Sequence, residues 1–389
     1  MRPMAKSMKV EVNPLVFKWL RVSSGWSVEE VSKRLKTSVD RIESIEGGKQ
    51  QPTLRQLNEL SIAFKRPIAS FLLPKPLKEP SLPKDYRMLP AIKDRFDKKT
   101  LYVIRKARNL QTISNELSAN INYSTKPLLE NKTIKENPNL IAEKFRDYFQ
   151  LNEKKVRQFA SSYPFFSYLR DIFEDLNILV FQFSMPIEDA RGFALTDMTP
   201  NVIVVNNADS IEARVFSLMH EFGHVLLGET IIDFPGFSQN PQTHVEKWCN
   251  EFASSFLLPP TRVHEIFSEE IRNLTDTKTL QSLSRRYKVS KGMLLFNMYK
   301  QKFISIEEYK ETIARYQPKD SALVNEAKEK EKKGGGITAD RRCLSEIGGK
   351  FVSIVANNYD RNFITYTDAL SYLSIKSKNF NQVLARAVK

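Results

Sequence analysis

A proline-rich stretch limits this chain to separate folding units. Four of the ten residues from 74 to 83 are proline. Because proline lacks a backbone N–H and restricts its own φ, such a stretch can form neither a helix nor an inner strand of a sheet. We therefore expect a linker over residues 74–98, which joins a first domain at 1–73 to a larger domain at 99–316.

The first 73 residues predict a bundle of short helices. Ser27 and Glu30 have the spacing of a capping box, and Gly47-Gly48 can end a helix because glycine readily adopts positive φ. The second and third helices, joined by a short turn, form a helix-turn-helix candidate. The expected helices cover residues 14–22, 27–35, 39–46, 54–64 and 67–73. Their expected core consists of Leu20, Val31, Leu35, Ile42, Leu57, Leu60 and Phe64.

The third of these helices ends in a recognisable turn. Glu46 precedes a Gly-x-x-x-Pro-Thr segment that runs from Gly48 to Thr53, and in this respect residues 27–53 resemble the helix-turn-helix of XRE-family regulators. The resemblance implies that the 39–46 helix enters the DNA major groove. It implies base contacts by Thr37, Ser38 and Arg41, and phosphate contacts by Lys33, Lys36, Lys49 and Arg55.

Acidic residues on the same helix favour a different partner. Asp40 and Glu43 carry carboxylates that phosphates repel, unless a carboxylate accepts a hydrogen bond from a cytosine amino group. Glu46 is not part of this argument, because related domains use it structurally. The alternative for this domain is therefore a protein-docking module.

The larger domain predicts an α+β fold, mainly helical with a small antiparallel sheet. Apolar, β-branched runs separated by turn residues indicate three strands, and a helix should follow from Ser210 and pack on the sheet through Ile211, Val215, Leu218 and Phe222. The strands are expected at 177–183, 192–195 and 201–206, and the other helices at 99–119, 139–149, 245–257, 306–316 and as a short pair within 280–298.

The helix from Ser210 contains a His-Glu-x-x-His sequence. His220 and His224 are two of only four histidines in the chain. Their i, i+4 spacing places both imidazoles on one face of a helix, where they can bind a single Zn²⁺, and Glu221 lies beside them as a candidate general base. Such a site needs a third ligand from elsewhere in the chain. We favour Glu246, with His244, Asp233 and Glu251 as the alternatives.

Four blocks in order resemble the ImmA/IrrE metallopeptidases. They lie at residues 190–195, 201–206, 213–227 and 246–259, and the resemblance covers roughly 135–315. It implies a zincin-like, gluzincin-type endopeptidase in which Glu246 completes the zinc site and Glu221 accepts a proton from the metal-bound water. Cys249 stands where the family usually has alanine, and as a small residue it is expected to pack.

Charge and cysteine content suggest the setting of the protein. The formal net charge is +15, which favours a polyanionic partner such as DNA, although a lysine-rich surface can also serve solubility. Cys249 and Cys343 are the only cysteines, and we interpret both as reduced thiols. The first ten residues lack an apolar segment and no run of about 18 apolar residues occurs, so a soluble cytoplasmic protein without a membrane segment is expected.

The whole sequence predicts a DNA-binding regulator with a zinc-dependent endopeptidase domain. Residues 317–337 are expected to form a charged linker, and 338–389 a helical appendix that acts as a lid or a dimerisation element. The expected substrate is a regulatory protein, such as a repressor or an antitoxin-like partner. The alternative is a regulator or antitoxin that cuts nothing and uses the metallopeptidase fold to sense or hold a partner. A homodimer would suit palindromic DNA sites.

Overall fold

The computed structural model of the chain describes residues 8–78, 96–228, 231–233, 244–269, 274–316 and 338–387. The chain separates into two compact units, and the division falls after Lys106, within helix α5 (Lys98–Asn120). Most of the expected 74–98 linker and all of the 317–337 linker lie outside the described residues. The domain boundaries drawn from the sequence therefore stay predictions.

The first unit is a bundle of short helices. Ser27 caps α2 in a capping box with Glu30, and Ser38 caps α3, as the sequence predicts. The last expected helix is a 3-10 helix instead of an α-helix. The elements are α1 (Pro14–Ser23), α2 (Val28–Leu35), α3 (Val39–Glu46), α4 (Leu54–Phe64) and η1 (Ile68–Leu72).

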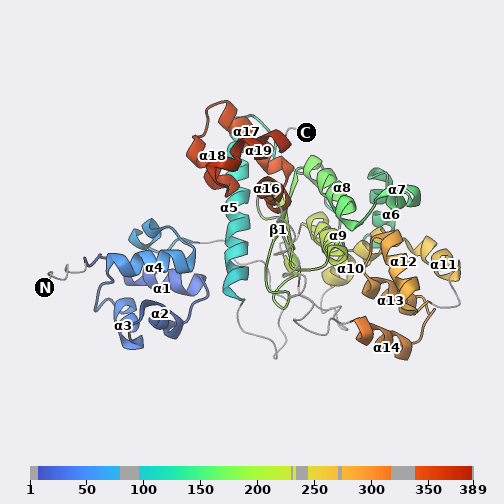
Figure 1. Cartoon of the computed structure of the whole chain (residues 1–389), viewed down its shortest axis with the longest axis horizontal. Coiled ribbons are helices and arrows are strands. Elements are labelled where there is room, and N and C mark those ends of the chain that lie inside the picture. Colours follow the sequence, from blue (N-terminus) through green and yellow to red (C-terminus); the bar gives the residue numbers. More distant parts are fainter. Residues whose placement is uncertain are drawn as a thin grey trace. The chain divides into compact units, whose positions relative to one another are not determined.

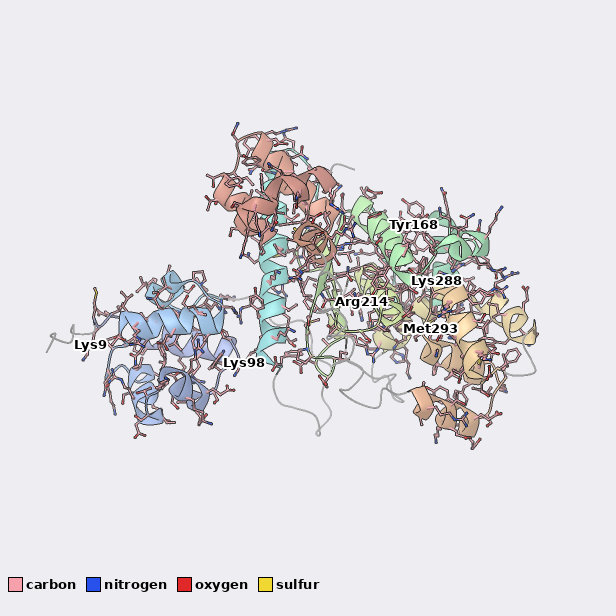
Figure 2. All side chains as sticks on the ribbon, viewed as in Figure 1. Lys9, Lys98, Tyr168, Arg214, Lys288 and Met293 are labelled. Atoms are coloured by element: carbon pink, nitrogen blue, oxygen red, sulfur yellow. The ribbon has the colours of Figure 1, made fainter. Side chains whose placement is uncertain are left out.

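The core of the first unit is the one expected from its apolar pattern. Leu20, Val31, Ile42, Leu57, Leu60 and Phe64 are fully or almost fully buried, and Leu35 packs against them. The start of α5 joins this unit: the ammonium of Lys98, labelled in Figure 2, lies 3.9 Å from the centroid of the Trp26 ring and 2.5 Å from Glu30 Oε1.

The second unit is mainly helical around one small sheet (Figure 1). Among the described residues no helix has the length and apolar character needed to cross a membrane. The helices of the second unit that follow α5 are α6 (Pro138–Tyr148), α7 (Glu153–Gln158), α8 (Ser162–Asp175), α9 (Ile211–Leu227), α10 (His244–Leu257), α11 (Pro260–Glu269), α12 (Thr277–Tyr287), α13 (Lys291–Lys300), α14 (Ile306–Tyr316), α16 (Ala339–Ile347), α17 (Gly349–Asp360), α18 (Tyr366–Leu373), η2 (Ser377–Asn379) and α19 (Phe380–Ala387).

The sheet is mixed, so the expectation of an antiparallel sheet is wrong. Its strands are β1 (Ile178–Phe183), β2 (Gly192–Leu195), β3 (Asn201–Asn206) and β4 (Ile231–Asp233), in the order β1-β3-β2-β4. β2 pairs antiparallel with β3 and β4, but β3 lies between β1 and β2 and pairs parallel with β1. The reason is that β2 and β3 form a hairpin whose second strand inserts beside β1. The apolar runs predict strands but not this order.

The C-terminal helices pack directly on the second unit. α16 covers the edge strand β1, and α17 contacts α8 (Figure 1). A buried ion pair fastens them: Arg170 Nε donates to Glu174 Oε1 at 3.1 Å, and Arg170 Nη1 donates to the carbonyls of Leu344 and Ser345 at 2.9 Å. The backbone N–H of Lys350 donates to Glu174 Oε2 at 2.7 Å. The region expected to form an appendix is thus tied into the edge of the sheet.

Candidate metal centre

Helix α9 carries the His-Glu-x-x-His sequence through the core of the second unit. Ser210 caps it, because its hydroxyl accepts a hydrogen bond from the backbone N–H of Ala213 at 3.3 Å. Gly228 ends it at a φ of 68°, in the left-handed region that glycine adopts without strain. The helix packs on β2 and β3, with Val215, Leu218 and Phe222 fully buried as the sequence predicts.

Two imidazoles and one carboxylate converge between α9 and α10. The Nε2 atoms of His220 and His224 lie 3.1 Å apart. Glu246 presents Oε2 at 3.3 Å from His220 Nε2 and Oε1 at 3.4 Å from His224 Nε2. The two histidines are at most 1% exposed, whereas the side chain of Glu246 is 19% exposed. The cluster is therefore buried on one side and reachable on the other.

This donor set fits a zinc ion. A tetrahedral Zn²⁺ with bonds of about 2.0–2.1 Å holds its ligand atoms roughly 3.3–3.4 Å apart, and the three observed separations fall near that spacing. Three protein ligands of the His, His, carboxylate type also leave a fourth position open, as catalytic zinc sites do. Mg²⁺ and Ca²⁺ prefer oxygen ligands and suit two imidazoles poorly.

The other expected third ligands lie elsewhere. Glu246 is the acidic residue in the first turn of α10 that meets the histidines, whereas His244 is exposed at the start of the same helix. Glu251 forms an ion pair with Lys300 instead. Asp233 belongs to β4, but its side chain lies outside the described residues.

Glu221 is completely buried against strand β2. A Cβ atom built on Gly192 would lie 2.9 Å from Glu221 Oε1, 3.1 Å from Glu221 Cγ and 2.9 Å from the carbonyl oxygen of Val204. Real Cβ contacts do not come that close, so Glu221 occupies space that any other residue at position 192 would take. Gly192 is not among the residues predicted for the site, although a glycine inside a strand is a signal that can indicate such a close approach.

Burial controls the charge of the cluster. Burial, together with the neighbouring His220, lowers the pKa of His224 to about 3, against the opposite effect of Glu246. Burial tends to raise the pKa of Glu246, but its interactions with His220, first of all the hydrogen bond, outweigh burial and lower that pKa. His224 is therefore neutral and Glu246 ionised near neutral pH, which are the states that bind a metal.

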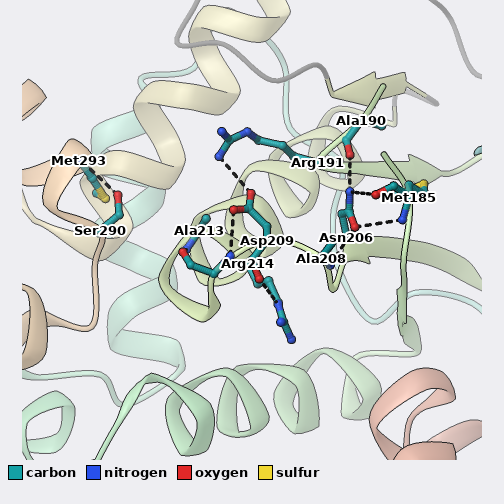
Figure 3. A network of polar contacts seen from close by, with 11 residues as sticks. Met185, Ala190, Arg191, Asn206, Ala208, Asp209, Ala213, Arg214, Ser290 and Met293 are labelled. Atoms are coloured by element: carbon teal, nitrogen blue, oxygen red, sulfur yellow. Dashed lines mark hydrogen bonds and ion pairs between the residues drawn. The ribbon is translucent and has the colours of Figure 1, made fainter. Parts of the chain in front are cut away.

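A buried asparagine fixes the loop that leads into Gly192 (Figure 3). The amide nitrogen of Asn206 donates to the carbonyls of Met185 and Ala190 at 3.0 and 2.8 Å, and its Oδ1 accepts from the N–H of Met185 at 3.1 Å. Beside it, Arg191 pairs with Asp209 at 3.1 Å. These contacts hold the start of β2, and hence Gly192, in place next to Glu221.

The residues predicted to bind DNA lie around the α2–α3 turn of the first unit. Lys33, Lys36, Ser38 and Lys49 are exposed, and Thr37 and Arg41 are half-buried. The hydroxyl of Ser38 accepts from the N–H of Arg41 as the cap of α3, and the guanidinium of Arg41 donates to Gln50.

The acidic residues of α3 divide into two kinds. Glu46 forms a two-pronged ion pair with Arg21, at 2.5 and 3.0 Å, and so holds α1 to α3. This agrees with the structural role expected for it. Asp40 and Glu43 are exposed on the same helix as Arg41, and no described contact commits them to the fold.

Residues 173–299 match a family model described as the IrrE N-terminal-like domain. The matched span runs from the end of α8 to α13 and includes His220, Glu221, His224 and Glu246. No curated protein and no solved structure matches the chain. The match supports the resemblance of this region to the ImmA/IrrE metallopeptidases, and it does not extend to the first unit.

Proposed function

We propose that the second unit is a zinc-dependent endopeptidase. The observation that carries this proposal is the convergence of His220, His224 and Glu246 at zinc-ligand spacing, on a helix where the buried Glu221 directly follows His220 in the sequence. The match of residues 173–299 to the IrrE N-terminal-like domain supports it independently.

In this proposal His220, His224 and Glu246 hold the metal. When bound, Zn²⁺ lowers the pKa of a water molecule toward neutrality and polarises a peptide carbonyl. Glu221 accepts a proton at a carboxylate oxygen and then delivers it to the nitrogen of the leaving amine. Gly192 makes room for Glu221 on the β2 side, because a Cβ atom at position 192 would lie 2.9 Å from Glu221 Oε1.

We also propose that the first unit binds DNA through α2 and α3. The exposed ammonium groups of Lys33, Lys36 and Lys49 suit phosphate contacts, and Arg41 lies at the start of α3, where recognition helices meet base edges. With both activities on one chain, the substrate class is a protein concerned with gene control, such as a repressor or an antitoxin-like partner. Asp40 and Glu43 support the competing assignment as a protein-docking module.

Metal content tests the zinc site. Purified wild-type protein should hold about one zinc ion per chain, as expected for a single three-ligand site. His220→Ala should lose the ion, whereas Glu221→Gln should keep it, because ligand and base are different residues. Equal zinc content in wild type and His220→Ala would remove His220 from the site.

Cleavage separates an enzyme from a binder. Wild type and Glu221→Gln are incubated with the proteins encoded by neighbouring genes, and the products are identified by mass spectrometry. A fragment that forms with wild type alone supports the peptidase. A partner that both proteins retain intact supports the non-catalytic alternative.

Gel-shift titrations with the chain's own promoter at several salt concentrations test the DNA interface. Arg41→Ala should weaken binding, while Lys310→Ala, an exposed lysine on α14, serves as the matched control. Equal affinities for wild type and Arg41→Ala would remove Arg41 from the interface.

A further inference from the structure

Helix α10 brings a second polar side chain to the metal centre. Cys249 lies three residues after Glu246, so both occupy the same face of the helix. The Sγ atom of Cys249 lies 3.6 Å from Nδ1 of His224. Both side chains are completely buried. The thiol therefore meets the ring nitrogen of His224 that points away from His220 and Glu246.

The direction of this hydrogen bond follows from the ring chemistry. His224 Nε2 faces His220 Nε2 at 3.1 Å and Glu246 Oε1 at 3.4 Å, and it must be free of a proton to bind a metal. A neutral imidazole then carries its proton on Nδ1. The sulfur of Cys249 is the acceptor that this Nδ1–H meets. If the thiol donated to Nδ1 instead, the proton would lie on Nε2 and block the metal position.

Gly223 makes this contact possible. A Cβ atom on Gly223 would lie 3.0 Å from Cys249 Sγ and 3.2 Å from both Cα and Cβ of Cys249. Because the nearest atoms include backbone, a side chain there would push α10 away from α9. Glycine at this position thus sets the distance at which α10 delivers Glu246 and Cys249 to the histidines.

We propose that Cys249 is a positioning residue for the metal ligand His224, and that Gly223 sets the approach that permits it. The inference rests on the proposed zinc site. The thiol accepts the Nδ1–H hydrogen bond, which fixes the ring orientation and keeps the Nε2 lone pair directed at the ion. Outer-shell acceptors of this kind commonly change metal affinity by about 10- to 100-fold.

Zinc affinity, measured by competition with a chelator, separates this role from packing. Cys249→Ala should weaken zinc binding by about 10- to 100-fold, and Cys249→Ser should recover much of the loss, because the hydroxyl also accepts a hydrogen bond. Pure packing predicts the reverse order, since serine adds a buried hydroxyl that alanine lacks. Cys343→Ala, at the other buried cysteine, is the matched control and should bind zinc like wild type.

Nuclear magnetic resonance of ¹⁵N-histidine-labelled wild type tests the same point with Cys249 unchanged. With four histidines in the chain, the ring nitrogens can be assigned by comparison with His224→Gln. The zinc-loaded protein should show a protonated Nδ1 and an unprotonated, metal-bound Nε2 for His224. Co²⁺-loaded Cys249→Ala should also show visible absorption bands shifted from those of wild type, whereas Cys343→Ala should not.

Each failure has a distinct meaning. Wild type that binds no zinc would overturn the proposed function. Wild type that binds zinc with the same affinity as Cys249→Ala, or that carries the His224 proton on Nε2, would overturn the positioning role alone. If Cys249→Ala does not fold, the serine variant and the labelled wild type still decide the question.

Discussion

Two groups of buried polar side chains in the second unit, the Arg170–Glu174 pair and the metal centre, differ in how their hydrogen-bond donors and acceptors are paired. At the pair of Arg170 and Glu174, each guanidinium nitrogen faces an acceptor, and Arg170 Nη2 also donates to the carbonyl of Val180 at 2.5 Å. At the metal centre, by contrast, His220, His224 and Glu246 each offer one potential metal-ligand atom, and these atoms all lie within 4.8 Å of one another. The first group is complete within the protein, and the second could hold a metal ion.

This difference indicates that the Arg170–Glu174 pair serves the stability of the fold and that the metal centre serves function. A buried ion pair whose donors and acceptors match holds elements together, and its loss leaves an uncompensated charge in the interior. The crowded ligand atoms of the metal centre contribute little to the stability of the fold by themselves. They add to that stability when a metal binds. The protein thus uses burial in two ways, once to fasten α16 and α17 to the sheet edge and once to create a ligand set.

Removal of one acceptor from the centre should have the largest effect on zinc. Glu246→Ala should reduce zinc from about one ion per chain to nearly none, because a catalytic site needs three protein ligands. In the presence of a chelator its free energy of unfolding should fall by about 1–3 kcal/mol, since His220 loses the carboxylate to which it donates a hydrogen bond. Metal analysis and urea titration measure the two quantities.

Neighbouring residues on α10 supply the controls for that experiment. Glu251→Ala and His244→Ala change the same helix but not the cluster, so both should keep the zinc ion. Loss of zinc from either control, with retention in Glu246→Ala, would contradict the ligand set.

Arg170→Ala should destabilise the fold by about 3–5 kcal/mol, because Glu174 would remain buried without its partner. Arg157→Ala removes a pair whose arginine side chain is 46% exposed and should cost less than about 1 kcal/mol. Urea unfolding compares the two. The double variant Arg170→Met/Glu174→Leu should restore much of the stability. Equal effects of Arg170→Ala and Arg157→Ala would mean that the buried pair does not fasten the C-terminal helices.

Gly192→Ala should lower activity by about 10- to 100-fold without loss of zinc, because the added methyl displaces Glu221 but touches none of the three ligands. Gly292→Ala is the matched control, since its Cβ would meet other atoms at 3.5 Å and beyond, in ordinary contact. The rate of partner cleavage and the zinc content are both measured. An unchanged rate in Gly192→Ala would show that Glu221 does not depend on this contact.

A last prediction concerns acid stability of the zinc-free protein. The pKa of His224 is lowered from 6.5 to about 3 in the folded state, so the unfolded chain binds a proton that the folded chain does not. Stability is therefore lost as the pH falls from 6.5 to about 3, at up to roughly 1.4 kcal/mol per pH unit from this residue. Denaturant titrations in chelator should give a shallower pH dependence for His224→Gln. The same slope for both proteins would contradict the buried, neutral state of His224.

Local structure was predictable wherever short-range chemistry determines it. The sequence predicts the α2–α3 turn, with Ser38 as a cap, and a pair of short helices within 280–298. The structure confirms both, and Ser290 is the N-cap of the second helix of that pair. The two turns match closely: each has a lysine in the left-handed region, Lys36 at a φ of 51° and Lys288 at 60°. Figure 2 labels Lys288 at the second turn.

Exposure was not predictable from the same local pattern. Helix α3 leaves Asp40, Arg41 and Glu43 at least partly exposed, whereas α13 buries half of its residues, including Met293 and Met298. Neighbouring helices decide this, since α14 packs against α13 and Asn297 bonds to Ser254 of α10. Long-range packing therefore distinguishes an exposed turn from a buried one.

Other features of the fold were not predicted from the sequence, because local residue patterns do not determine them. Helix α8 was not assigned, because Pro164 in its first turn and a run of aromatic residues obscure its helical period. The parallel pairing of β1 with β3 and the contact of Cys249 with His224 join residues far apart in the chain. The convergence of Glu246 on the histidines could be predicted, because the family resemblance indicates which distant residue joins them. The spacing of residues within one helix does not give that information.

The central claim is that zinc and Glu221 together hydrolyse a peptide bond. The most direct measurement is the rate of partner cleavage as zinc is added back to zinc-free wild type and to zinc-free Glu221→Gln. The rate for wild type should rise in proportion to zinc occupancy, and the rate for Glu221→Gln should stay about 100- to 10,000-fold lower at equal occupancy. Cleavage that does not depend on zinc, or equal rates for the two proteins, would contradict the account.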